Sequence, residues 1–301
     1  MAEILQQLPR GARVAVVRLR SLGDCVLTTP ALEILKKSRP DLEVGVVVEE
    51  PFVAVFEGNP DVNALLEPRV RHLAGWRPQL CLNLHGGIRS LRLTALSGAP
   101  TRAGFAHFRF SFVHNVRIPR AQEILGVQRK VHTAEHLASA VFYLGAERRE
   151  IPRARLFAGG GGPTSARDYA VMHPAASAPD KTWPAQKFLA VARQLKLETI
   201  FIAGKGEDLS PFREFRRLAG APLSEVKSLL SRAALFIGND SGPAHMAAAL
   251  QVPSVVIFGA SDPEIWGPWK AAAEVIVAGE AIHRVEVSEV LGAVERLGVA
   301  A

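Results

Sequence analysis

The sequence predicts an α/β protein with two similarly wound domains, each built on a parallel sheet that helices cover on both faces. Short apolar runs of strand length alternate with helix-like segments along the whole chain. Four glycines and a proline interrupt this pattern at residues 158–163. The chain has 301 residues, which is the length of about two domains.

The first half contains three strand-like runs and two helix-like segments. Residues 13–19, 42–48 and 80–84 are predicted to be buried strands. Residues 21–24 are expected to form a loop after the first strand. Thr28 or Thr29 can then cap a helix that has Pro30 in its first turn, runs through residue 37 and ends before Pro40. A second helix is predicted at residues 132–144.

The second half repeats the pattern. Strands are predicted at residues 169–173, 199–203, 234–238 and 254–258, and helices at 185–195, 223–232, 243–250 and 287–297. We therefore expect a first domain at 1–157, a glycine-rich linker at 158–167 and a second domain at 168–301. The last helix either stays with the second domain or packs back on the first. The domains are expected to face each other across a cleft, with ligands beyond the carboxyl ends of the strands.

Charge is distributed unevenly between the halves. Residues 1–157 contain 22 Lys and Arg against 14 Asp and Glu, a net charge of +8, whereas residues 158–301 have a net charge of −1. Residues 69–130 contain 11 basic residues and one acid, Glu123. This asymmetry indicates an anionic partner for the first half: a nucleic acid, a membrane or a phosphorylated ligand.

Other features favour a cytoplasmic protein. The N-terminus has neither the basic start nor the long apolar core of a signal peptide, and no apolar run approaches the roughly 18 residues of a membrane span. Two cysteines, Cys25 and Cys81, do not make a disulfide framework. We find no nucleic-acid-binding module around the basic residues, so nucleic acid is not expected as a partner.

Asp24 and the segment 238–245 are the first candidates for chemistry. Asp24 follows the first strand, so its carboxylate either projects into the cleft or is a solvated or capping acid. In the segment 238–245 a strand leads into a helix, where the free N–H groups of Ser241 and Gly242 suit a phosphate. Asp240 either hydrogen-bonds a ribose or caps this helix, and His245 faces the same place. A well-capped helix without a ligand remains the alternative.

Two further loops follow strands of the second half. In residues 173–183, Ser177 offers a hydroxyl and Lys181 a compact cation of the kind used against phosphate oxygens. Trp183 is interpreted as a packing residue. In residues 203–207, Glu207 can accept ribose hydroxyls, although this loop lacks the spacing of a phosphate-binding P-loop.

The segment 132–136 has the form H-x-x-E-H, an inverted zinc-protease pattern. A catalytic zinc needs a third protein ligand, and Glu147 and Glu150 are unconvincing candidates. We therefore expect no metal, and we interpret His136 as a packed or cleft-facing residue.

Four segments together resemble glycosyltransferase family 9, the lipopolysaccharide core heptosyltransferases. Residues 18–32 resemble the family's N-terminal signature, residues 177–183 and 238–245 resemble its donor site, and residues 258–269 resemble the segment that follows. The resemblance covers nearly the whole chain. It implies the GT-B fold, with the acceptor in the first domain and the nucleotide sugar in the second.

The resemblance also implies a reaction and residue roles. It implies the transfer of a heptose from ADP-heptose to an anionic inner-core glycolipid, with inversion, with Asp24 as general base and without a metal or other cofactor. The implied donor-binding residues are Ser177, Lys181, Glu207, Asp240, Ser241, Gly242 and His245. The candidates for acceptor binding are Ser21, Arg89 and Arg102. A monomer that contacts the inner membrane peripherally is expected.

Several departures leave the substrates open. Arg20, Ala175 and Ala176 stand where other residue types are frequent in the family, and residues 203–207 match only loosely. A family member that uses another nucleotide sugar or a protein acceptor is therefore the main alternative. A non-catalytic binding protein and a nucleic-acid binder are the others.

Overall fold

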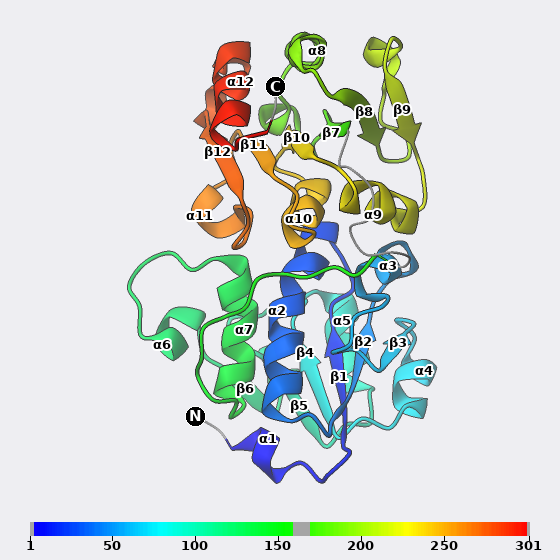
Figure 1. The fold of residues 1–301 in the computed structure, drawn as a ribbon. Helices are drawn as coiled ribbons and strands as arrows, with labels where there is room; N and C mark the ends of the chain where they lie inside the picture. Colours follow the sequence, from blue (N-terminus) through cyan, green and yellow to red (C-terminus); the bar gives the residue numbers. More distant parts are fainter. Residues whose placement is uncertain (1–2, 159–168, 300–301) are drawn as a thin grey trace. The chain divides into compact units, whose positions relative to one another are not determined.

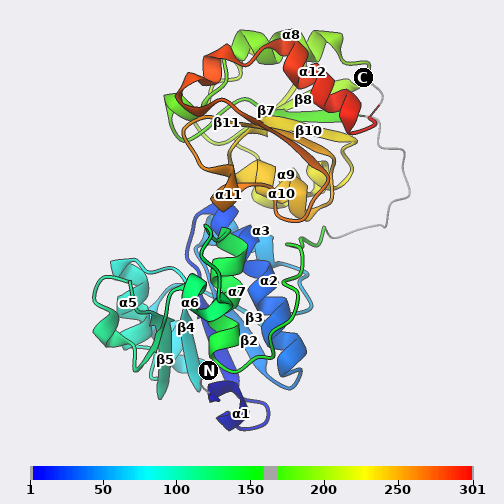
Figure 2. The same ribbon diagram turned by 90° about the vertical axis from the view of Figure 1, so that its left-hand side faces the viewer.

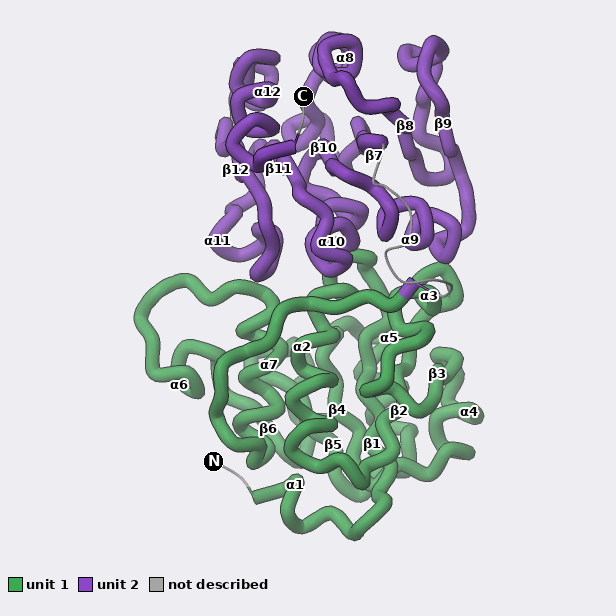
Figure 3. The backbone as a smooth tube through the Cα atoms, viewed as in Figure 1, with its two compact units in different colours: residues 1–157 green, residues 158–301 purple. Residues whose placement is uncertain are grey.

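The computed structural model describes residues 3–158 and 169–299, and these fall into two compact units, residues 1–157 and 158–301 (Figure 3). The proposed linker, apart from Ala158, lies outside the described residues. In the described residues, each unit contains one six-stranded sheet whose strands are all parallel. The predicted α/β class is confirmed, and the cleft between the domains stays a prediction.

In unit 1 the strand order is β3-β2-β1-β4-β5-β6 (Figure 1). The strands are β1 (Arg13–Val17), β2 (Glu43–Val47), β3 (Ala64–Leu66), β4 (Leu80–Asn83), β5 (Thr101–Phe105) and β6 (Val116–Ile118). The α-helices are α1 (Ile4–Gln7), α2 (Leu22–Ser38), α3 (Val53–Phe56), α4 (Val70–Gly75), α5 (Ile88–Ala95), α6 (Ala121–Leu125) and α7 (Thr133–Tyr143), with short 3-10 helices η1 (Glu50–Phe52) and η2 (Ser111–Val113).

In unit 2 the strand order is β12-β11-β10-β7-β8-β9. The strands are β7 (Tyr169–His173), β8 (Glu198–Ala203), β9 (Arg216–Ala219), β10 (Leu235–Asn239), β11 (Ser254–Phe258) and β12 (Ala273–Val277). The α-helices are α8 (Ala185–Gln194), α9 (Leu223–Ser231), α10 (Gly242–Ala249), α11 (Pro263–Trp266) and α12 (Val287–Arg296), with 3-10 helices η3 (Pro179–Lys181), η4 (Ser210–Phe212) and η5 (Gly279–Arg284).

Both sheets have the same winding. The chain builds each sheet outward in one direction and then returns to build the other half, so the order reverses between β1 and β4 and between β7 and β10. Ligands of open parallel sheets bind at such reversals, beyond the carboxyl ends of the strands. The topology therefore marks one candidate site in each unit.

Helices cover both faces of each sheet. In unit 1, α2 and α7 pack together on one face and α5 lies on the other; in unit 2, α8 and α12 lie on one face and α9 and α10 on the other (Figure 2). Of the two positions considered for the last helix, the structure has α12 against α8, β11 and β12 of its own unit. None of the described helices is long and apolar enough to cross a membrane.

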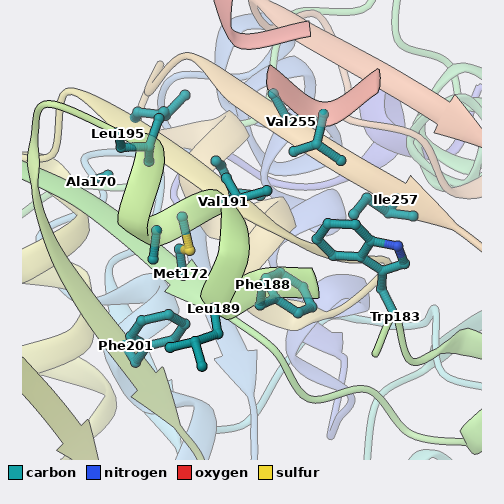
Figure 4. Packing of buried hydrophobic residues seen from close by; sticks show 14 of the residues in the cluster. Ala170, Met172, Trp183, Phe188, Leu189, Val191, Leu195, Phe201, Val255 and Ile257 are labelled. Carbon is teal, nitrogen blue, oxygen red and sulfur yellow. The ribbon is translucent and has the colours of Figure 1, made fainter. Parts of the chain in front are cut away.

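The core of unit 2 supports its site. Trp183 is fully buried beside Phe188, with ring centroids 4.9 Å apart in an edge-to-face arrangement (Figure 4). Its indole N–H donates to the carbonyl oxygen of Val285 at 3.0 Å. The interpretation of Trp183 as a packing residue agrees with this geometry, and the ring anchors the end of the loop that carries Lys181.

The predicted start of the first helix is wrong. Helix α2 begins at Leu22 rather than after Thr28 or Thr29, and Pro30 lies inside it. Proline cannot donate a hydrogen bond to the carbonyl four residues earlier, here that of Val26. The Thr29 hydroxyl donates to that carbonyl oxygen at 2.8 Å instead. The Thr-Pro pair that resembled a helix start is thus a helix interior, and Asp24 lies in the first turn rather than in a loop.

Candidate functional site

The site of unit 1 lies where β1 and β4 end. Arg18 follows β1 and is 5% exposed. Its Nη1 lies 3.4 Å from Oδ1 of Asp24, and its Nη2 donates to the carbonyl oxygen of Leu84, the residue that follows β4. The guanidinium therefore connects the two central strands of the sheet to the first turn of α2.

A second contact holds the Asp24 carboxylate from its other oxygen. The hydroxyl of Ser21 donates to Oδ2 of Asp24 at 3.0 Å. Ser21 is the N-cap of α2, but its side chain makes no capping bond to the helix. Asp24 keeps a side-chain exposure of 23%, so the carboxylate is fixed in direction and still reachable by a hydroxyl group.

The other titratable groups near Asp24 are poor bases or nucleophiles. Burial raises the pKa of the Cys25 thiol to about 12, so it stays protonated. Burial, with the charges of His107 and Arg18, lowers the pKa of His136 to about 4. Burial and the Arg18 charge also lower the pKa of His85. The imidazoles are therefore neutral at pH 7, and Asp24 is the base candidate because of its position after β1 and its contacts with Arg18 and Ser21.

The site of unit 2 is organised by His173, the last residue of β7. Its Nδ1 lies 3.0 Å from Oγ of Ser241, and its Nε2 lies 3.3 Å from Oε2 of Glu207. The same Oε2 accepts a hydrogen bond from the N–H of Gly204 at 2.6 Å. These bonds from His173 and Gly204 hold the pKa of Glu207 below its usual value. One imidazole thus joins the ends of β7 and β8 to the start of α10.

The start of α10 gathers charged groups. Ser241 is the N-cap, and its side chain does not bond to the helix N–H groups. Lys181 Nζ lies 3.8 Å from Oδ2 of Asp240, and His245 Nε2 lies 4.0 Å from Oδ1 of the same carboxylate. Backbone N–H groups and the helix dipole make such a start suitable for phosphate. A cation and an anion-binding helix end therefore lie together.

The loop before Lys181 is held by close packing. Asn239 lies at the end of β10. Its side-chain oxygen accepts a hydrogen bond from the backbone N–H of Trp183 at 3.0 Å, and its side-chain nitrogen donates to the carbonyl oxygen of Pro174 at 2.8 Å. A Cβ atom added to Gly259 would lie 2.0 Å from the carbonyl oxygen of Asp180, so this position admits only glycine. The backbone next to Lys181 is thereby fixed against β10 and β11.

Most of the site residues predicted from the sequence lie close together in the fold, but some do not. Asp24 and Ser21 meet in unit 1, and Lys181, Glu207, Asp240, Ser241, Gly242 and His245 gather in unit 2. Ser177 is exposed in the loop after β7. Arg89 lies in the first turn of α5, after β4, and its Nη1 is 2.5 Å from Oε1 of Glu49.

Arg102 is not brought to this edge. It lies at the amino end of β5, and its guanidinium donates to the carbonyl oxygens of Val113 and Ala99. These bonds fix a loop at the far end of the strand. The expectation that Arg102 contacts an acceptor therefore has no support from its position.

Sequence reasoning gave no role to Arg18, His173 or Asn239. All three are buried polar residues at or just beyond the carboxyl end of a central strand. A charged or polar residue at the end of a Val- or Ile-rich run is unusual unless it is paired. That pattern was the available signal.

The H-x-x-E-H segment serves as a helix start. His132 is the N-cap of α7, and its Nδ1 accepts a hydrogen bond from the Ala134 N–H at 3.1 Å. Glu135 pairs with Arg129 at 2.6 Å. His136 stacks on Phe105, with ring centroids 4.0 Å apart. No group of three metal-ligating side chains occurs in residues 3–158 and 169–299.

Comparison with known proteins places the chain in a family. The model of glycosyltransferase family 9 (heptosyltransferase) matches residues 70–291. Lipopolysaccharide heptosyltransferase 3 of Escherichia coli is 28% identical, over 83% of this chain and 84% of that protein.

Solved structures share the fold. A glycosyltransferase of family 9 from Veillonella parvula superposes with a TM-score of 0.81 at 23% identity, covering 95% of this chain and 97% of that one. The E. coli heptosyltransferase WaaC with ADP gives a TM-score of 0.79 at 20% identity, covering 95% and 99%. The chain therefore belongs to glycosyltransferase family 9, the heptosyltransferase family, and has its GT-B fold.

Proposed function

We propose that this glycosyltransferase moves a heptose from ADP-heptose to an anionic acceptor of the lipopolysaccharide inner core, with inversion at the anomeric carbon. The observation that carries the proposal is the Asp24 carboxylate, held by Arg18 and Ser21 at the switch point of the first sheet. Family membership supports heptosyl transfer. The relative named as a lipopolysaccharide heptosyltransferase supports the acceptor, and the relative solved with ADP supports the nucleotide.

In this reaction Asp24 acts as general base. It takes the proton of an acceptor hydroxyl while that oxygen bonds to the anomeric carbon of the heptose. The bond between the anomeric carbon and the diphosphate oxygen breaks, and ADP leaves with the electron pair. A single displacement inverts the configuration. Positioned general-base catalysis contributes about 10²–10⁴-fold.

At the donor, Lys181 and the start of α10 neutralise the charge that develops on the departing diphosphate. Lys181 supplies a full positive charge, and the N–H groups around Ser241 and Gly242 supply oriented dipoles. We assign the charge neutralisation to these groups and not to a metal ion. Glu207, whose Oε2 is held by His173 and Gly204, is assigned to the nucleoside. Ser177, Asp240 and His245 complete the donor site.

At the acceptor, Ser21 and Arg89 are the proposed contacts. Arg89 follows β4 on the edge that carries Asp24 and is 58% exposed in its side chain. The net charge of +8 in residues 1–157 suits an acceptor that carries phosphate or carboxylate groups. We propose that the enzyme works as a monomer in the cytoplasm, at the inner face of the membrane.

A donor and acceptor panel tests this function. The protein is incubated with ADP-, GDP- and UDP-sugars and a truncated core acceptor, and products are identified by mass spectrometry and by NMR of the anomeric proton. We expect transfer from ADP-heptose alone, with inverted configuration. Transfer from a UDP- or GDP-sugar, or retained configuration, contradicts the proposal. Transfer to a protein in place of the core acceptor supports the alternative acceptor class.

A further inference from the structure

Large apolar side chains are exposed on one part of unit 1. Ile88 and Phe112 are each 71% exposed, Leu96 is 50% exposed and Phe110 is 43% exposed. Among the described residues of unit 1, Leu65, at 36%, is the only other large apolar side chain that is exposed. All four lie on α5, at its end or in the loop that contains η2. Isolated exposed apolar residues are ordinary, but a group of large ones marks an interaction surface.

The four residues belong to one surface. Helix α5 packs against η2. The rings of Phe110 and Phe112 are edge-to-face with centroids 6.1 Å apart. On α5, Ile88 and Leu96 are eight residues apart, a little over two helical turns, so they share one side of the helix. The opposite side of α5 carries the buried Ser90 and Thr94, and the helix packs against β4. We call this set the α5–η2 surface.

Arginines accompany these apolar side chains. Arg92 lies midway between Ile88 and Leu96 on the same side of α5 and is exposed. The guanidinium of Arg109, also exposed, lies 4.8 Å from the centroid of the Phe110 ring. Residues 88–112, which contain the whole surface, hold four arginines and no aspartate or glutamate. The partner of this surface must therefore combine negative charge with an apolar phase.

We propose that the α5–η2 surface docks the protein on an anionic lipid bilayer. Phe112, Phe110, Ile88 and Leu96 enter the boundary between headgroups and acyl chains, where aromatic side chains are favoured. Arg92 and Arg109 contact lipid phosphates, because each arginine is attracted to the negative charge of an anionic membrane surface. Nucleic acid offers phosphate without the apolar phase, and an acidic protein would leave Phe112 and Ile88 in water.

The surface is suitably placed for the proposed reaction. Helix α5 starts soon after the carboxyl end of β4, on the edge of the sheet that holds Asp24. From there the surface continues along α5 to Leu96 and into η2, where Val113 accepts a hydrogen bond from Arg102 near the amino end of β5. Docking would therefore lay this side of unit 1 on the bilayer, with the start of α5 nearest the edge that holds Asp24. The role of docking in reaching a membrane-anchored acceptor rests on the proposed function, whereas the docking itself is measured without any substrate.

Vesicle flotation tests the docking. The full chain is mixed with vesicles of phosphatidylethanolamine and phosphatidylglycerol or with vesicles of phosphatidylcholine. We expect binding to the anionic vesicles alone. Phe112→Ser is expected to weaken partitioning about tenfold, because most of the ring is available for burial in the bilayer. Val277→Ser, at a side chain 60% exposed on β12 of unit 2, is the matched control and is expected to leave partitioning unchanged.

A charge variant completes the test. Arg109→Gln is expected to weaken partitioning about fivefold, with the difference shrinking at high salt because the Debye length falls from about 10 Å at 0.1 M to about 3 Å at 1 M. Equal binding to both vesicle types, or full binding by Phe112→Ser with an unchanged melting temperature, overturns the proposal. A Phe112→Ser variant that turns a dimer into a monomer in sedimentation while still binding vesicles shows that the surface joins two copies.

Activity separates this inference from the proposed function. Phe112→Ser is expected to keep normal transfer to a deacylated, water-soluble acceptor and to lose transfer to the same acceptor embedded in vesicles. If the wild type transfers to neither acceptor but still binds anionic vesicles through Phe112, the docking stands and the proposed function fails. Equal loss with both acceptors assigns Phe112 to the reaction site and overturns the docking role.

Discussion

His136 should remain neutral in the folded protein down to a pH near 4. Its ring stacks on Phe105, with centroids 4.0 Å apart and planes at 19°. Burial is the largest cause that lowers its pKa from 6.5 to about 4, followed by the charges of His107 and Arg18, while the nearby Asp24 charge opposes the shift. A partly buried imidazole on an aromatic face loses water that its charged form needs.

The shift has a consequence for stability. The unfolded chain binds a proton at His136 near pH 6.5, whereas the folded chain resists it until about pH 4. The contribution to the free energy of unfolding is therefore complete above pH 6.5 and declines as the pH falls from 6.5 to 4. At 1.36 kcal/mol per pH unit, the loss across this range is about 3 kcal/mol.

His136→Phe removes the titrating group and keeps a ring against Phe105. Between pH 6.5 and pH 4 the free energy of unfolding should fall by about 3 kcal/mol less in this variant than in the wild type. Chemical denaturation of both proteins at several pH values measures the difference. The histidine Cε1 protons, followed by NMR from pH 8 to pH 4, give the pKa directly, with the variant assigning the resonance. A His136 signal that titrates near pH 6.5, or parallel stability curves for the two proteins, would refute the reasoning.

Three further perturbations follow from the contacts. Arg155→Met should lower the free energy of unfolding by about 2 kcal/mol, measured by denaturation, because Glu33 and Asp61 each lose a partner at 2.9 Å while Glu33 keeps Lys37 at 2.6 Å. Gly259→Ala should weaken ADP binding in calorimetry, because the added Cβ displaces the Asp180 carbonyl next to the proposed diphosphate ligand. Lys181→Ala should weaken ADP binding about tenfold through the loss of a charge-assisted contact.

Each of these has a control of the same kind. Arg149→Met removes an exposed pair with Glu147 and should cost less than about 1 kcal/mol. Gly292→Ala, in α12 with its nearest contact at 3.6 Å, should leave ADP binding unchanged. Lys196→Ala removes an exposed lysine between α8 and β8 and should also be silent. Equal effects of variant and control would contradict the assigned contact.

The central strands and the long helices could be predicted from the sequence because burial on both faces of a parallel sheet produces continuous apolar runs. Strands β7 and β11 were predicted with their observed ends. Strands β3, β5, β6, β9 and β12 were missed. The four of them at sheet edges, β3, β6, β9 and β12, are partly exposed, as in Arg216–Ala219 with its two arginines. Their pairing depends on the neighbouring strand and leaves little trace in the local pattern.

The candidate site was only partly predictable for a related reason. Loops that follow strands identify Asp24, Lys181 and Ser241 by position. The partners that orient them, Arg18 and His173, act through contacts such as the 3.0 Å approach of His173 to Ser241 across 68 residues of sequence. The start of α2 was misplaced because a Thr-Pro pair favours a helix start, yet the Thr29 hydroxyl also satisfies the carbonyl that proline leaves free.

Asp24→Asn tests the central claim most directly, because it removes the base and preserves the shape of the side chain. We expect heptosyl transfer, followed by mass spectrometry under saturating donor and acceptor, to fall about 10²–10⁴-fold, while ADP binding by calorimetry stays at the wild-type level. Glu50→Gln, an exposed acid just after β2, is the control and should retain full activity. Near-normal turnover in Asp24→Asn would contradict the assignment of Asp24 as the base.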